Sequence, residues 1–214
     1  MSIRAFEKLP EHERDHIIRV CMAEFADQGY RRASTNTMVK QLDIPKGSIF
    51  YWFENKDGLY LYLVDLCVKR FVEAFADAAR EWPSEILARL RILIEASFAF
   101  LEQYPDHYRL FSSFMDGEAR HLLGPYLKEH WQEGLAVWAG WFAGIDTSDF
   151  RSTPEEVQRL LMWIIAGIKI EMYALVDRRD SVAASRTHFM GQLDMVIRLL
   201  AHAIYRHPEQ WGYA

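Results

Sequence analysis

Cysteine is scarce in this sequence, and long apolar runs are missing. The 214 residues include two cysteines, Cys21 and Cys67, each among apolar neighbours, and two isolated thiols make neither a disulfide framework nor a zinc site. We expect both to be buried core thiols in a reducing compartment. No stretch approaches the roughly 18 apolar residues of a membrane span, and the charged N-terminal segment lacks the apolar centre of a signal peptide. These absences predict a soluble, cytoplasmic protein that does not bind a membrane.

The sequence also lacks the motifs that mark common catalytic sites: a nucleophile elbow, a phosphate-binding loop, a dinucleotide fingerprint and a zinc signature. We therefore expect no enzymatic activity, no metal and no cofactor. Several histidines show no metal-ligand spacing and are expected at the surface, namely His107, His121, His130 and His188.

Charge is distributed unevenly along the chain. The net charge is −5, but residues 31–56 contain five basic and two acidic residues, a local net charge of +3. The rest of the chain therefore carries −8. A basic patch on an acidic body is typical of a protein that touches nucleic acid with one end.

Apolar residues recur at intervals of three and four along most of the chain, and no segment alternates with period two. This pattern predicts amphipathic helices, so the expected fold is all-α with about nine helices. We expect a three-helix domain with a helix-turn-helix over residues 1–55. A larger helical body is expected over residues 56–214, entered by a long helix from about 56 to 80. Two local signals are clear: Gly29 should end a helix, and Thr153 and Glu156 should form a capping box.

Residues 34–53 have the features of a helix-turn-helix, two short helices packed at a steep angle. Ser34 or Thr35 can cap the first helix, and Asp43 tolerates the backbone angles of the turn. The side chains expected to face inward are Met38, Val39, Leu42, Ile44, Ile49 and Phe53.

The second helix of this motif is expected to begin at Pro45 or Lys46 and to run to about Tyr51. Its start presents Lys46, Gly47 and Ser48, the positions from which a recognition helix reaches base edges and phosphates. Each residue alone could be an ordinary loop or core residue, but their joint spacing favours DNA binding.

This segment resembles the DNA-binding domain of the tetracycline-repressor (TetR) family of bacterial regulators. The resemblance covers about residues 14–62. It rests on Ala23, Phe25, Gly29, Thr35, the run Lys46-Gly47-Ser48-Ile49-Phe50-Tyr51-Trp52-Phe53, Lys56 and Leu59. The chain departs from the family pattern where Phe50 replaces a tyrosine, Val39-Lys40 an Ile-Ala pair, Asp43 a glycine and Pro45 a serine.

The resemblance implies where DNA would be contacted. The start of the first motif helix would lie near the phosphate backbone and a base edge, and the start of the second in the major groove. The aromatic residues of the second helix would contact the backbone or a thymine methyl, and the start of the long helix would meet a phosphate. At the start of the first motif helix the implied residues are Thr35 and Asn36, and at the start of the second they are Lys46, Gly47 and Ser48. The aromatic residues are Tyr51 and Trp52, and the residue of the long helix is Lys56.

The resemblance also implies a homodimer, because in the family the last two long helices pair with those of a second copy. Here these helices would span about 154–178 and 184–206. Trp163, Ile170 and Tyr173 lie off the main apolar stripe of the first, as a dimer face would require. The alternative is a helix buried on all sides within one subunit.

The resemblance further implies that residues 56–214 form a ligand-binding and dimerisation domain, which would hold a small-molecule effector. Lys169 and Glu171 interrupt an apolar helix, so either they border the dimer face in solvent or one lines the pocket. An aromatic pocket with a carboxylate suits an aromatic or amphipathic ligand, although core packing can explain each aromatic residue. The candidate ligand-binding residues are Phe71, Phe75, Phe98, Phe111, Trp138, Trp163 and Glu171.

The expected function is that of a transcription repressor that binds a double-stranded, palindromic DNA operator and is released by a small molecule. The alternative is a helical small-molecule-binding protein with weak or lost DNA binding.

Overall fold

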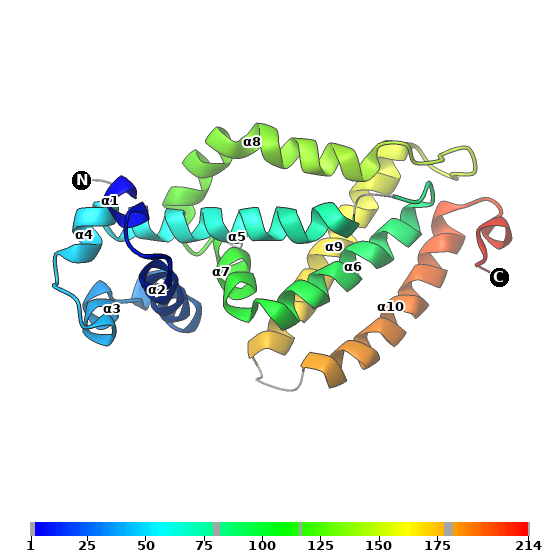
Figure 1. Cartoon of the computed structure of the whole chain (residues 1–214). Coiled ribbons are helices and arrows are strands. Elements are labelled where there is room, and N and C mark those ends of the chain that lie inside the picture. The colour runs from blue at the N-terminus through cyan, green and yellow to red at the C-terminus, as the bar shows by residue number, and fades with distance from the viewer. Residues whose placement is uncertain (1–2, 79–81, 116, 178–181, 214) are drawn as a thin grey trace. The chain divides into compact units, whose positions relative to one another are not determined.

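The computed structural model describes residues 3–78, 82–115, 117–177 and 182–213, without the side chains of 76–78, 130–139, 173, 175–177 and 182–185. Within these ranges the chain is helical, with one isolated bridge between Phe150 and Tyr205 and no strand. The all-α prediction is confirmed. The elements shown in Figure 1 are α1 Ile3–Glu7, α2 Glu11–Arg32, α3 Thr35–Leu42, α4 Ser48–Phe53, α5 Lys56–Ala78, α6 Ile86–Gln103, α7 Pro105–Met115, α8 Arg120–Phe142, α9 Pro154–Asp177, α10 Val182–Ile204 and the 3-10 helix η1 Pro208–Trp211.

The chain forms two compact units. Unit 1 comprises Met1–Glu73 and Tyr104–Trp131, and unit 2 comprises Ala74–Gln103 and Gln132–Ala214. Two of the boundaries between units fall inside α5 and α8, so each of these helices contributes to both, and the third lies between α6 and α7. The functional division between residues 55 and 56 stays a prediction, because packing units do not define functions.

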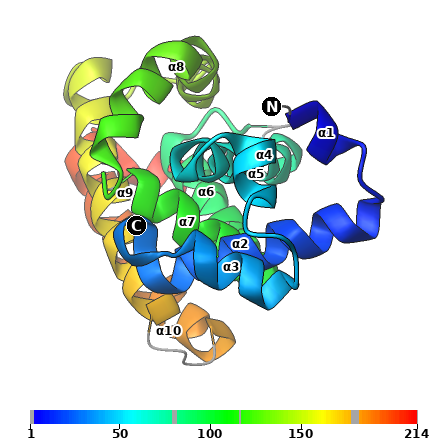
Figure 2. The same cartoon turned by 90° about the vertical axis from the view of Figure 1, so that its left-hand side faces the viewer.

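Unit 1 surrounds the start of the long helix α5. Helix α2 packs against α3 and α7, while α4 contacts both α1 and α3 (Figure 2). The predicted stripe on α2 is buried at Ile17, Cys21, Met22 and Phe25. Gly29 interrupts α2 with a φ of 69°. A β-carbon added at this position would lie only 2.1 Å from Glu118 Oε1. Glycine is therefore needed at this kink for its positive φ.

Unit 2 is built around α10, which packs against α6 and α9. The predicted capping box at the start of α9 is confirmed: the Glu156 backbone N donates to Thr153 Oγ1 at 3.3 Å, and the Thr153 backbone N donates to Glu156 Oε2 at 3.0 Å. The helices bury a shared apolar core that includes Leu90, Ile94, Phe98, Leu101, Val157, Leu161, Phe189, Leu193, Ile197 and Ile204. Among the helices described, none has the length and apolar character needed to cross a bilayer.

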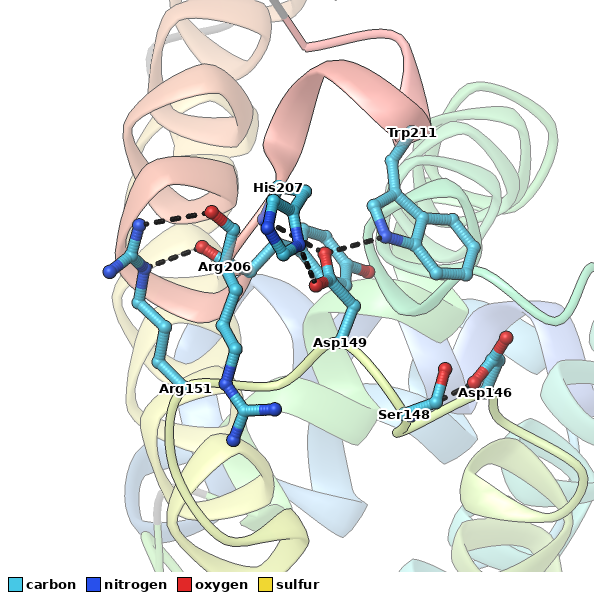
Figure 3. A network of polar contacts seen from close by, with 8 residues as sticks. Asp146, Ser148, Asp149, Arg151, Arg206, His207 and Trp211 are labelled. Atoms are coloured by element: carbon cyan, nitrogen blue, oxygen red, sulfur yellow. Dashed lines mark hydrogen bonds and ion pairs between the residues drawn. The ribbon is translucent and has the colours of Figure 1, made fainter.

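A network of polar contacts, here called the C-terminal clasp, joins the α8–α9 connection to the segment after α10 (Figure 3). The Asp149 carboxylate accepts from the His207 backbone N at 3.0 Å and from Trp211 Nε1 at 3.2 Å, and lies 2.8 Å from His207 Nδ1. Arg151 Nε donates to the Tyr205 carbonyl at 2.5 Å. Burial alone would raise the pKa of Asp149, but the hydrogen bonds from His207 and Trp211 hold that pKa below its ordinary value.

Glu85 extends the same anchoring to α6. Its carboxylate accepts from the backbone N of Leu87 at 2.8 Å and of Ala88 at 2.5 Å, capping the N-terminus of α6. It also accepts from the hydroxyls of Tyr205 and, at 2.8 Å, Tyr213. Residues 205–213 are thus fixed to two separate segments of unit 2.

Candidate nucleic-acid interface

The first helix of the predicted motif, α3, begins and ends as its sequence predicts. Ser34 Oγ accepts from the Thr37 backbone N at 3.4 Å, and the Ser34 backbone N donates to Glu24 Oε1 at 2.9 Å. At the other end Asp43 adopts the left-handed conformation, with φ 52° and ψ 41°. Both ends are fixed locally, which sets the direction of α3 relative to α2.

The second helix, α4, begins later than expected. It starts at Ser48 and not at Pro45 or Lys46, because the Ser48 backbone N first closes a turn onto the Pro45 carbonyl at 2.9 Å. The first helical hydrogen bond runs from the Tyr51 N to the Gly47 carbonyl at 2.8 Å. Lys46 and Gly47 therefore belong to the turn that leads into the helix.

The inward and outward faces of this helix-turn-helix are separated as predicted. Met38, Val39, Ile49 and Phe53 are buried, while Leu42 and Ile44 are partly buried against the same core. Six of the implied DNA-contacting residues are exposed or half-exposed on α3, α4 and the turn between them: Thr35, Asn36, Lys46, Gly47, Ser48 and Tyr51. A β-carbon at Gly47 would meet no atom within 4 Å. The backbone at this point is thus open to a large partner.

The two remaining residues of the implied DNA surface have partners inside unit 1. Trp52 is half-buried, with its ring centroid 5.5 Å from that of Phe6. Lys56 Nζ donates to the Arg31 carbonyl at 3.3 Å and lies 4.9 Å from the centre of the Tyr30 ring. Lys56 joins the end of α2 to the start of α5, a role that the sequence analysis missed, and its contact with a phosphate stays a prediction.

The connection between α4 and α5 depends on a glycine that the sequence analysis also missed. Asn55 Oδ1 accepts from the Gly58 backbone N at 2.8 Å and so caps α5. A β-carbon at Gly58 would lie 2.1 Å from the Phe53 carbonyl oxygen. The close approach of α4 to the first turn of α5 therefore requires glycine at position 58. The available signal was an asparagine cap followed three residues later by glycine.

A polar cluster joins α2, α5 and α8 within unit 1. The Tyr30 hydroxyl donates to Asp57 Oδ1 at 2.5 Å and lies 3.3 Å from His121 Nε2. Burial, followed by the hydrogen bond to Asp57, raises the pKa of Tyr30 to about 12. His121 Nε2 is 3.4 Å from Asp57 Oδ2. His121 is exposed, as expected, but it links the start of α8 to the helix-turn-helix domain.

The candidate ligand-binding residues fall into different parts of the chain. The rings of Phe71 and Phe111 stack at 5.1 Å in unit 1, and Phe98 meets Phe189 edge-on at 5.0 Å in unit 2. Phe75 is buried, and the Trp138 side chain lies outside the described residues.

Trp163 and Glu171 differ from the other candidates, because both are exposed on α9. The buried face of α9 is formed by Val157, Leu161 and Met172, so the helix turns Trp163 and Glu171 away from the core of unit 2. Neither lines an enclosed site within the described residues. A role of Glu171 in ligand binding stays a prediction.

One histidine also departs from expectation. His107 is half-buried, with its ring 5.4 Å from that of Tyr104. Burial, assisted by the charge of Arg70, lowers the pKa of His107 to about 4. It is therefore a neutral packing residue near pH 7 and not the surface group that was predicted.

An exposed apolar surface runs along α9 and α10, the two helices expected to pair with a second copy. The exposed fraction is 69% for Trp163, 70% for Ile170 and 64% for Leu199. Met162 and Met195 are exposed as well. Large exposed apolar side chains on two neighbouring helices are typical of interaction surfaces. The side chain of Tyr173, the third predicted residue of this face, lies outside the described residues.

Known proteins resemble this chain both in sequence and in fold. Residues 17–63 match the family described as bacterial regulatory proteins, tetR family. The HTH-type transcriptional activator FasR of Mycolicibacterium smegmatis is 30% identical over 108 residues, which cover 50% of this chain and 49% of that protein. The aligned segment thus spans about half the length of this relative.

Two solved structures share the fold over nearly the whole chain. A TetR family transcriptional regulator from Chloroflexus aurantiacus has a TM-score of 0.68 at 18% identity, covering 95% of this chain and 98% of the other. A TetR-like transcriptional regulator from Rhodococcus sp. RHA1 has a TM-score of 0.62 at 18% identity, covering 90% and 96%. At this identity the likeness concerns the fold.

Proposed function

We propose that this chain, as a member of the TetR family of bacterial regulatory proteins, binds a specific DNA operator and regulates transcription from it. The observation that carries the proposal is the open, basic start of the recognition helix. Lys46 and Gly47 are exposed immediately before α4, with nothing within 4 Å of a β-carbon at Gly47. A protein backbone that is free of its own side chains at this point can approach base edges closely.

The proposed binding mode divides the surface by chemistry. The start of α4, with Lys46, Gly47 and Ser48, enters the major groove and reads base edges. The N-terminus of α3, with Thr35 and Asn36, faces the phosphate backbone, where the positive end of a helix favours an anion. Phosphate contacts fix the register, and base contacts choose the sequence.

We propose a homodimer as the binding unit. The exposed apolar surface of α9 and α10 supports this, since two such surfaces can cover each other about a two-fold axis. A two-fold dimer reads two half-sites about 34–36 Å apart, which requires a palindromic operator. The test is molar mass in solution by light scattering. Ile170→Glu should produce monomers, whereas Val72→Glu, the same kind of substitution at an exposed apolar position on α5, should leave the dimer intact. A monomeric wild type would contradict the proposal.

We propose that the regulator acts as a repressor in the cytoplasm and leaves its operator when an aromatic or amphipathic small molecule binds the helical body. The aromatic side chains of Phe71, Phe75, Phe98 and Phe111 are the candidates that are buried or half-buried. The relative FasR is named an activator. A promoter-reporter assay distinguishes a repressor from an activator. Deleting the gene for a repressor raises expression of the reporter, and deleting the gene for an activator lowers it.

Selection of bound sequences from random double-stranded DNA tests the function directly. We expect a palindromic consensus whose binding weakens as salt rises, because phosphate contacts release counterions. Lys46→Ala should weaken binding to the consensus more than to unrelated DNA. Lys69→Ala, an exposed lysine on α5 outside the proposed surface, is the matched control. Flat, sequence-independent binding would favour the alternative of a small-molecule-binding protein that has lost its operator.

A further inference from the structure

Helix α1 holds a single buried side chain, and that side chain lies against the recognition helix. Phe6 is 0% exposed, although α1 is only five residues long. Its ring lies 5.5 Å from that of Trp52 and 4.9 Å from that of Phe53. It also meets the Tyr62 ring edge-on at 5.6 Å. Phe6 therefore joins α4 to α5 in one aromatic cluster, here called the Phe6 cluster.

Helix α4 needs such external support. It has six residues, and isolated helices of this length are unstable in water. Ile49 and Phe53 bury its inner face in the core of unit 1. Trp52 projects from a different side of the helix and is half-buried, with Phe6 against it. The contact with α1 thus fixes a second side of α4, which restricts rotation of the helix about its own axis.

Helix α1 is itself held in place at its C-terminal end. The Leu9 backbone N donates to the Phe6 carbonyl at 3.0 Å, and Arg14 Nη1 donates to the Glu7 carbonyl at 2.9 Å. The pKa of Tyr62 is raised by burial and then by the negative charge of Glu7, as expected where α1 covers this ring. Phe6 is therefore carried on an anchored support.

We propose that Phe6 is a positioning residue for sequence recognition: through Trp52 and Phe53 it sets the angle at which α4 presents its exposed start to DNA. The inference rests on the proposed function. Binding groups must be held within about 0.5 Å of their productive geometry. Base contacts depend on that placement, whereas long lysine side chains can reach phosphates from several helix angles. Loosening Phe6 should therefore reduce sequence discrimination more than total DNA binding.

The test compares Phe6→Leu with Phe114→Leu. Phe114 is a suitable control because it is also 0% exposed and packs against aromatic rings in unit 1, those of Tyr60 and Tyr126. It lies on α7. The readout is the ratio of affinities for the selected operator and for unrelated DNA at one salt concentration, measured beside the melting temperature.

We expect Phe6→Leu to lower this ratio about tenfold, the loss of roughly one base contact, with unrelated DNA bound as before. Phe114→Leu should lower the melting temperature comparably and keep the ratio. Equal ratios in the two variants would overturn the inference while leaving the proposed function intact. A wild type without a selected operator would instead contradict the proposed function. If Phe6→Leu does not fold, the pair Phe6→Met and Phe114→Met, with a flexible side chain that fills irregular core space, provides the same comparison, and equal ratios would again overturn the inference.

Discussion

Replacing Gly47 with alanine should weaken DNA binding without weakening the fold. Gly47 has φ −78° and ψ −11°, a conformation that alanine adopts readily, and its β-carbon would touch nothing within 4 Å. Restricting the unfolded chain stabilises the variant by about 0.4–1 kcal/mol, while alanine is a poorer N-cap than glycine by a similar amount. The net change should stay within about 0.5 kcal/mol, or roughly 2 °C in melting temperature for a chain of this size.

The effect of Gly47→Ala on binding should be larger. A methyl group between the backbone and the groove wall displaces the start of α4, and losing one base contact costs about 1–3 kcal/mol. Fluorescence anisotropy with labelled operator DNA measures the loss of affinity, and a thermal melt of the same variant measures its stability. Gly124→Ala is the matched control, because Gly124 is exposed on α8 with equally open surroundings.

A third glycine variant, Gly58→Ala, should destabilise the fold and serves as a comparison for Gly47→Ala. In Gly58→Ala the new β-carbon would lie 2.1 Å from the Phe53 carbonyl oxygen, so the α4–α5 connection must shift, at a cost of about 1–3 kcal/mol. Its melting temperature should fall. If Gly47→Ala binds the operator as tightly as the wild type and Gly124→Ala do, Gly47 does not face DNA and the reasoning fails.

Three further predictions concern stability and reactivity. Thr153→Ala should lower the free energy of unfolding by about 1 kcal/mol through loss of the α9 cap, and Thr153→Ser should restore it; equal urea midpoints would contradict this. Burial raises the pKa of Cys21 to about 12, so about one thiol in ten thousand is ionised at pH 8; a colorimetric disulfide reagent should label Cys21 only after unfolding, and rapid labelling of the native protein would refute its burial. Because the pKa of Asp149 is lowered in the fold, its carboxylate stabilises the protein above about pH 4, the unfolded value, and this contribution disappears as the pH falls through the lower folded value. The difference in urea midpoint between wild type and Asp149→Asn should therefore narrow on acidification, and a constant difference would exclude this linkage.

The features that sequence predicted correctly are those whose partners are close in the chain. The cap formed by Ser34, the left-handed turn at Asp43 and the capping box of Thr153 and Glu156 each involve residues within four positions of one another. The alternation of buried and exposed faces on α3 and α4 follows from helical periodicity in the same way. Local chemistry determines such features before the chain folds further.

The features that sequence did not predict depend on distant partners. The phosphate contact of Lys56 stays a prediction, but sequence did not show that its ammonium group binds the Arg31 carbonyl, 25 positions earlier. Trp52 is half-buried against Phe6, on a helix that sequence did not predict, and its contact with DNA stays a prediction. His107 was placed at the surface because nothing in its local sequence reports that α7 is half-buried there. In each case tertiary packing determines the environment, which periodicity cannot supply.

The C-terminal clasp has a consequence for the order of folding. It pairs Asp149 with His207, 58 residues away, and Glu85 with Tyr213, 128 residues away. Contacts so distant in sequence form slowly, because a long loop must close before they stabilise anything. All residues of unit 1 precede position 132, so that unit can assemble on a nascent chain while unit 2 waits for residues 205–213 to leave the ribosome. The unit that contains the helix-turn-helix can therefore complete its fold before the other unit.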